Sequence, residues 1–277
     1  FQNGPLYSSS FLPAAYQGTW IRDLENPIAD LKSTSVTRQR QRVQIDTLRQ
    51  LHELRRDSQG KAEELDARMA SFELAYRMQI QAPEAFLIEE ETEATKRLYG
   101  LDQPHTAPIG KQLLLARRLA ERGVRFIQVF DSQGGNNIWD HHNGINKKLP
   151  ENCAQTDLPV AGLIQDLKSR GLLDDTLVVW GGEFGRTPTA EGADGREHHP
   201  FGFTMWLAGG GIKGGHVHGA TDDFGWYAVQ DKVHVHDLHA TMLHLLGLDH
   251  EALTYRYSGR DFRLTDVSGR VVDEIVA

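Results

Sequence analysis

The chain has 277 residues, of which 39% are hydrophobic and 25% charged, and this composition is that of a globular protein. A single cysteine, Cys153, excludes an internal disulfide framework. The formal net charge of -8 argues against a broad nucleic-acid footprint, so no nucleic-acid partner is expected. No run of 18 apolar residues occurs, and we expect no membrane span. Thirteen histidines are the one unusual feature.

The first residues, Phe1 to Pro5, include no Met and show no signal-peptide pattern. We therefore expect the chain to be a processed or excised part of a longer protein.

Residues 1–108 have the pattern of an irregular and helical N-terminal segment. Apolar residues recur at helical spacing on either side of Gly60, at Ile45, Leu48, Leu51, Leu65, Met69, Phe72 and Tyr76. This spacing places each set on one helix face, and it predicts an antiparallel helical hairpin. We assign no chemistry to this segment.

Residues 109–277 have the pattern of alternating helices and strands. Helices are predicted over 112–122 and 157–171, and strands over 124–130, 176–180 and 203–208. Strands separated by helices predict parallel crossover connections, so we expect an α/β fold with an open, mainly parallel sheet flanked by helices. Ligands of such sheets bind beyond the carboxyl ends of the strands.

Carboxylates and imidazoles follow these predicted strand ends. Asp140 and His142 lie in the loop after the first strand, Glu183 follows the second, and His198 lies in the loop before the third. Imidazole and carboxylate are ligands that zinc, manganese and iron accept, whereas calcium prefers oxygen ligands. Their convergence predicts a divalent metal site. We expect zinc, with manganese and calcium as the alternatives.

Several motifs carry a family resemblance, namely Trp139-Asp140-x-His142, Gly182-Glu183-Phe184-Gly185-Arg186-Thr187-Pro188, Gly195-Arg196-Glu197-His198 and Leu207-Ala208-Gly209-Gly210-Gly211-Ile212-Lys213-Gly214-Gly215. They resemble the family catalogued as domain of unknown function 1501, which belongs to the alkaline phosphatase and sulfatase-like superfamily. The resemblance implies that Asp140, His142 and His198 are ligands of one metal. Glu183 then stands where phosphatases have the aspartate of a second metal. The next residue is Phe184, where phosphatases have His and sulfatases have Asn.

The resemblance also implies an activity, the metal-dependent hydrolysis of a small sulfate or phosphate ester by an exported protein. We expect Arg186 to be the catalytic residue that binds the anionic group, because its planar fork suits two oxygens. The alternative for Arg186 is a structural salt bridge with Asp194 or Glu197.

Members of the superfamily carry their nucleophile on an N-terminal strand, and the opening of this chain resembles the middle of such a protein. The nearest substitute in this chain is Ser132, in a loop rich in Gly and Asn. We therefore expect the chain as it stands to leave sulfate and phosphate esters uncleaved.

Two other functions stay open. One is a non-catalytic ligand-binding or assembly protein on the same scaffold. The other is a glycosidase that pairs Glu183 with Asp140 or Glu197, which leaves the histidines unexplained.

Overall fold

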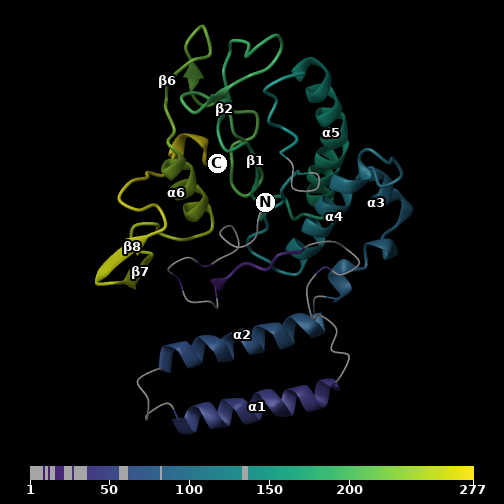
Figure 1. Cartoon of the computed structure of the whole chain (residues 1–277), viewed down its shortest axis with the longest axis vertical. Helices are drawn as coiled ribbons and strands as arrows, with labels where there is room; N and C mark the ends of the chain where they lie inside the picture. Colours follow the sequence, from purple (N-terminus) through teal and green to yellow (C-terminus); the bar gives the residue numbers. More distant parts are fainter. Residues whose placement is uncertain are drawn as a thin grey trace. The chain divides into compact units, whose positions relative to one another are not determined.

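The computed structural model describes residues 9, 12, 16–21, 27, 36–55, 62–81, 83–132 and 137–277. The chain divides into two compact units, Phe1–Glu90 and Glu91–Ala277 (Figure 1). The sequence pattern places a boundary after residue 108, whereas the division in the structure follows residue 90. The second unit contains all the predicted metal ligands.

Two long helices, α1 (Arg38–Arg55) and α2 (Ala62–Gln81), dominate the described part of the first unit, before the short 3-10 helices η2 (Pro83–Phe86) and η3 (Ile88–Glu90). Gln41, near the start of α1, donates to Gln79 near the end of α2 at 2.6 Å. His52, near the end of α1, lies 2.7 Å from Asp66 near the start of α2. The two helices are therefore antiparallel, as the apolar spacing predicts. The expected turn at Gly60 lies outside the described residues.

Helices α3 (Glu93–Leu98), α4 (Ala107–Glu121) and α5 (Ile145–Ser169) build the core of the second unit. Figure 1 shows α4 and α5 side by side, and Leu114 and Leu167 on them are buried. Each such leucine contributes about 1.5–3 kcal/mol relative to an exposed one. Tyr99, directly after α3, is also buried, and its hydroxyl donates to Oδ2 of Asp166 on α5 at 3.0 Å. Apolar packing and a buried hydrogen bond thus hold these helices together.

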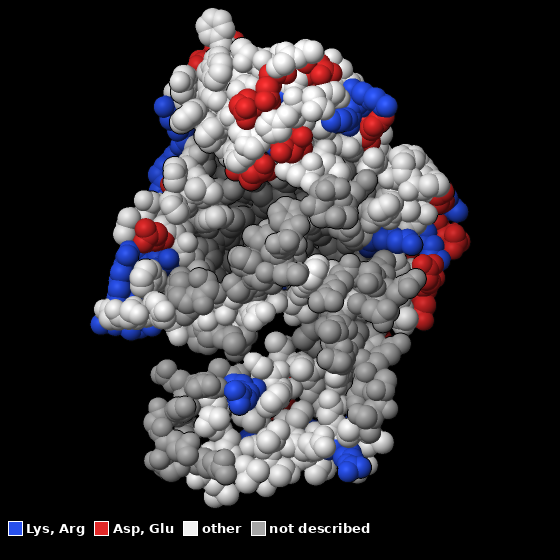
Figure 2. Space-filling model, viewed as in Figure 1, with Lys and Arg blue, Asp and Glu red and all other residues white. Residues whose placement is uncertain are grey.

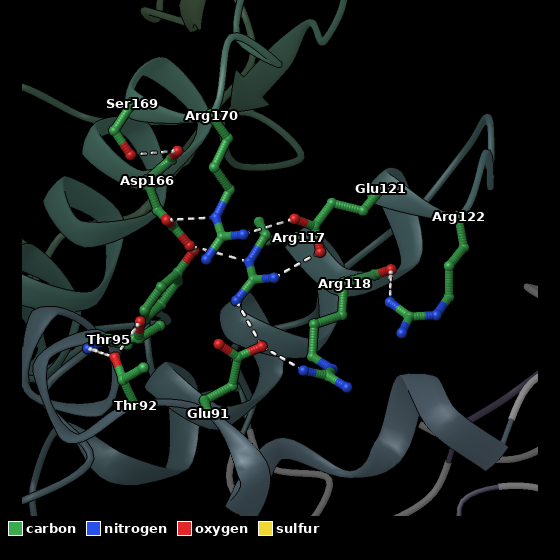
Figure 3. Close-up of polar contacts among 11 residues, drawn as sticks. Glu91, Thr92, Thr95, Arg117, Arg118, Glu121, Arg122, Asp166, Ser169 and Arg170 are labelled. Atoms are coloured by element: carbon green, nitrogen blue, oxygen red, sulfur yellow. Dashed lines mark hydrogen bonds and ion pairs between the residues drawn. The ribbon is translucent and has the colours of Figure 1, made fainter.

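A buried ion cluster links the same helices (Figure 3). The side chain of Arg117 on α4 is 1% exposed, and its guanidinium contacts the carboxylates of Glu91 at 2.8 Å, Glu121 at 2.6 Å and Asp166 at 2.9 Å. Burial by itself lowers the pKa of Arg117, but the bonds to Glu121 and Glu91 outweigh it and raise the pKa. Burial likewise acts to raise the pKa of Glu91, and hydrogen bonds from Arg117 and Arg118 hold it below its usual value. Both shifts favour the charged forms of Arg117 and Glu91.

The expected open parallel sheet is wrong. The strands of the described residues form antiparallel pairs, β1 (Val178–Trp180) with β4 (Trp206–Ala208), β2 (Gly185–Arg186) with β3 (His198–His199), β5 (Ala220–Thr221) with β6 (Ala228–Gln230), and β7 (Thr254–Tyr257) with β8 (Arg260–Arg263). Strands β1 and β4 fall within two of the predicted strands, but the connection between them contains no helix. Two parallel strands need a crossover connection, usually a helix, which returns the chain to the end of the sheet where the first strand began. In this chain the second strand returns antiparallel, with Val179 opposite Leu207.

Two further sequence predictions are wrong, namely the strand over 124–130 and the start of the helix that follows it. Residues 124–130, predicted as a strand, have no regular secondary structure, and Phe126 is 72% exposed. Their β-branched and aromatic residues favour an extended chain, but a strand also needs a partner, and none of the described strands pairs with them. Helix α5 begins at Ile145 rather than at Asp157, so Asp157 and Pro159, the residues predicted to open it, lie inside it.

The C-terminal part is built around α6 (Val235–Leu245) and ends with the 3-10 helix η4 (Asp273–Ile275). The backbone N–H of His234 donates to Asp237 at 2.9 Å, which caps the start of α6. Thr241 on α6 accepts from the backbone N–H of Val272 at 3.0 Å and so ties the chain's last segment to this helix.

Two features of the described residues concern the distribution of basic side chains and the character of the helices. On the face drawn in Figure 2, the Lys and Arg side chains of the described residues lie in small separate groups. Where the structure describes a helix, that helix lacks the combination of length and apolar character that a bilayer crossing requires.

Candidate metal centre

Three predicted ligands converge on one point, although they come from two separate segments. Oδ1 of Asp140 lies 3.0 Å from Nε2 of His142 and 3.1 Å from Nε2 of His198. The two imidazole nitrogens are 3.2 Å apart. The three atoms form a nearly equilateral triangle, which we call the ligand triangle, and all three side chains are partly open to solvent.

The ligand triangle has the size of one face of a zinc tetrahedron. Ligand atoms at about 2 Å from a tetrahedral zinc ion lie about 3.3 Å from each other. Two imidazole nitrogens and one carboxylate oxygen suit zinc or manganese better than calcium. When both imidazoles are neutral, the facing atoms can all carry lone pairs, and a shared proton or metal ion relieves their repulsion.

The hairpin of β2 and β3 fixes the direction of His198. Adjacent residues of a strand point to opposite faces. His199 is buried and its ring packs edge-on against Trp226 at a centroid distance of 4.7 Å, so His198 faces the other way, towards the ligand triangle. Arg186 stands directly opposite His198 in the ladder. The two side chains therefore share one face of the hairpin.

The segment that carries Asp140 and His142 is held by the buried residue between them. His141, between them, is buried, and its Nε2 lies 3.2 Å from the Asn152 amide on α5. Burial lowers the pKa of His141, so this imidazole is neutral and serves packing. Its two neighbours face the opposite side, where they meet His198. The buried histidine thus anchors the two ligands.

Arg186 is the cation already present at the ligand triangle. Its Nη1 is ion-paired with Oδ1 of Asp140, the same oxygen that faces the two histidines. Its Nη2 lies 3.4 Å from Glu183. Asp194, an expected alternative partner, instead accepts from the backbone N–H of Gly144 at 2.8 Å. The salt bridges of Arg186 therefore lie within the set of predicted site residues.

Glu183 lies outside the ligand triangle. Its side chain is 55% exposed, and it reaches the cluster through Arg186. The ring of Phe184 packs against that of His198 at 4.6 Å, and the Arg186 guanidinium lies 5.6 Å from the centre of the Phe184 ring. An aromatic ring thus covers one side of His198.

A family model described as "Protein of unknown function (DUF1501)" matches residues 2–276. The chain belongs to the DUF1501 family. The motifs around Asp140, Glu183 and His198 thus identify the family correctly. Neither a curated protein nor a solved structure matches the chain significantly.

In this DUF1501 protein, a carboxylate that the sequence does not single out also contacts His142. Oε2 of Glu191 lies 2.6 Å from Nδ1 of His142, on the side of the ring away from the ligand triangle. Oε1 of Glu197 is 3.9 Å from the same nitrogen. Glu191 is 49 residues from His142 in the chain. No periodicity or motif joins the two, and only the three-dimensional structure could reveal the pair.

Charges at the DUF1501 site favour an ionised carboxylate beside a protonated imidazole. Burial acts to raise the pKa of Asp140, but hydrogen bonds from His198 and Arg186 outweigh it, so the pKa is lowered. The hydrogen bond to Glu191 raises the pKa of His142, and the charge of Asp140 adds to this. The site therefore attracts a cation, either a proton or a metal ion.

Proposed function

We propose that this DUF1501 protein binds one zinc ion through Asp140, His142 and His198 and hydrolyses a small anionic ester of sulfate or phosphate. The observation that supports the proposal best is the ligand triangle, with edges of 3.0, 3.1 and 3.2 Å. Catalytic zinc sites use three protein ligands of this kind and leave a fourth position open. The partly exposed side chains leave such a position accessible.

In this proposal, a bound metal ion and Arg186 would have separate roles. A divalent metal held there would supply Lewis-acid polarisation of an ester oxygen. Arg186 would bind the anionic oxygens of the ester, because its planar guanidinium suits two oxygens of a tetrahedral anion. Since Asp140 Oδ1 is common to Arg186 and the ligand triangle, the guanidinium and a metal ion compete for one oxygen.

A kinship with the alkaline phosphatase and sulfatase-like superfamily is part of the proposal. Its support is the match of the motifs around Asp140, Glu183 and His198. We propose a single metal, because Phe184 packs against His198 where the two-metal members have a further polar residue.

A second candidate is a protein that binds an anion without cleaving it. The packing of Phe184 against His198 favours this candidate, because an aromatic ring replaces a polar residue beside the ligands. In that case Arg186 and the metal would form an anion receptor.

The test is an assay with para-nitrophenyl sulfate and phosphate in the presence of zinc or manganese. Both this chain and the protein as its gene encodes it are assayed beside Asp140→Asn. We expect metal-dependent turnover by the protein as its gene encodes it, and we expect that turnover to disappear in Asp140→Asn. Metal-dependent binding of sulfate or phosphate without turnover would favour the second candidate. Turnover that survives Asp140→Asn would contradict the proposed site.

A further inference from the structure

We propose that Glu191 is a positioning residue for the metal site, where it fixes the tautomer and the ring orientation of His142. This inference rests on the proposed zinc site. Oε2 of Glu191 lies 2.6 Å from Nδ1 of His142, which is the distance of a strong charge-assisted hydrogen bond. The carboxylate thus holds the ring nitrogen that does not face the ligand triangle.

The contact between Glu191 and His142 determines which nitrogen of the imidazole ring carries the proton. A neutral histidine carries one N–H, and the other nitrogen offers a lone pair. Because the Glu191 carboxylate can only accept, it selects the tautomer with the proton on Nδ1. The lone pair of Nε2 then points towards Oδ1 of Asp140 at 3.0 Å and Nε2 of His198 at 3.2 Å. Carboxylates that orient metal-bound histidines in this way typically raise metal affinity.

The backbone of Glu191 is fixed against the segment that it orients. Glu191 and Gly195 exchange two backbone hydrogen bonds, of 2.9 and 2.8 Å, which close a small loop. The next residue, Arg196, donates from its backbone N–H to the carbonyl oxygen of His141 at 2.9 Å. Residue 195 must be glycine, because a Cβ there would overlap the carbonyl oxygen of His142. The loop that carries Glu191 therefore lies directly against the backbone of His141 and His142.

Glu197 provides a comparison within the same site. Its Oε1 is 3.9 Å from Nδ1 of His142, too far for a hydrogen bond, and it accepts instead from the backbone N–H of His198 at 2.9 Å. Glu191 and Glu197 place the same charge near one imidazole, but only Glu191 has the geometry to orient it. A comparison of variants at Glu191 and Glu197 therefore separates the effect of orienting the His142 ring from the effect of a nearby negative charge.

The experiment measures zinc binding by calorimetry and the tautomer of His142 by ¹⁵N NMR of the metal-free protein at alkaline pH. The variants are Glu191→Ala, Glu191→Gln and Glu197→Gln. We expect Glu191→Ala to weaken zinc binding by about 10–100-fold and to shift His142 from the Nδ1–H tautomer. Glu191→Gln should recover most of the affinity, because its amide oxygen still accepts from Nδ1. Glu197→Gln should bind within about threefold of the wild-type protein, as expected for a partly exposed charge.

Each other outcome has a definite meaning. Wild-type zinc affinity in Glu191→Ala would overturn the inference and leave the proposed zinc site intact. Equal losses in Glu191→Ala and Glu197→Gln would also overturn it, because charge alone would then explain the effect. A second zinc ion held by Glu191, Glu197 and His142 Nδ1, which also lie within ligand distance of one another, would overturn it as well. A wild-type protein that binds no zinc would contradict the proposed function itself.

Discussion

Arg186 and His198 are cross-strand partners in the β2–β3 hairpin, and both contact the same oxygen of Asp140. The hairpin thus presents one guanidinium and one imidazole to a single carboxylate. In the structure, Arg186 provides the positive charge that this carboxylate needs. A metal ion bound to the ligand triangle has to share Asp140 with it.

This shared oxygen leads to a prediction for Arg186. Arg186→Met removes the competing cation, so zinc affinity should rise by about 3–10-fold, in the range of one partly exposed ion pair. Affinity for sulfate or phosphate in the zinc-loaded protein should fall. Both are measurable by calorimetry.

Arg186→Lys is the matched control, because it keeps the charge and loses the planar fork. Zinc affinity should then stay near that of the wild-type protein while anion affinity falls. If anion affinity is unchanged and only thermal stability falls, Arg186 has a purely structural role.

The proposed zinc binding should depend on pH through His142. Hydrogen bonding to Glu191 raises its pKa above the ordinary 6.5, so protons compete with zinc already above that pH. Zinc affinity should decrease as pH falls through the raised pKa, and a series of titrations between about pH 5.5 and 8.5 measures it. In the metal-free protein, a fall in pH has the opposite effect, because it increases the contribution of His142 to folding stability. The stabilisation from protonated His142 is present below 6.5 and is lost as pH rises through the raised pKa.

The control for this pH profile is Glu191→Gln, which keeps an acceptor for Nδ1 but replaces the charged carboxylate, so its hydrogen bond raises the pKa of His142 less. Its midpoint for zinc binding should move to lower pH. A midpoint that stays where it is in the wild-type protein would show that another group controls the profile.

The close approach at Gly195 predicts a local effect of a small substitution. A Cβ in Gly195→Ala would overlap the His142 carbonyl oxygen and force the loop away from the ligand segment. We expect a loss of about 1–3 kcal/mol in the free energy of unfolding, together with weaker zinc binding. Gly214→Ala is a suitable control, because a Cβ there meets open space. Equal effects of the two substitutions on zinc binding would show that this close approach does not hold the ligand segment in place.

The buried cluster around Arg117 predicts a large effect on stability. Arg117→Met leaves the carboxylates of Glu91, Glu121 and Asp166 without their shared partner, so unfolding should become easier by about 3–5 kcal/mol. Urea denaturation followed by tryptophan fluorescence measures the change. The exposed Arg122 is the matched control, and Arg122→Met should shift stability by less than about 0.5 kcal/mol. A similar shift in both variants would mean that the buried cluster adds little.

The helices were largely predictable from the sequence because their signals are local. Apolar spacing predicts α1, α2 and the larger part of α4, whose stripes depend on neighbours three and four residues away. The sheet was not predictable in this way. Residues 124–130 have strand-like composition, but whether they pair depends on a partner elsewhere in the chain. Likewise, a proline favours the first turn of a helix without preventing a helix from beginning earlier, as α5 does around Pro159.

In the candidate site, the residue types were predictable from local sequence motifs, whereas the contacts that position them were not. Asp140, His142 and His198 could be singled out by residue type and motif, and the structure brings them together. The expected reason, parallel strand ends meeting at one edge, is wrong. The β2–β3 hairpin and the buried side chains of His141 and His199 determine their directions instead. Glu191 contributes through one contact across 49 residues, which no local pattern encodes.

The most direct test of the proposed zinc site is elemental analysis of protein equilibrated with zinc and then freed of unbound metal. We expect one zinc per chain in the wild-type protein and none in the Asp140→Asn, His198→Ala double variant. Glu183→Gln should retain the full amount, because Glu183 lies outside the ligand triangle. One zinc per chain in the double variant, or none in the wild-type protein, would contradict the assignment of Asp140, His142 and His198 as the metal ligands.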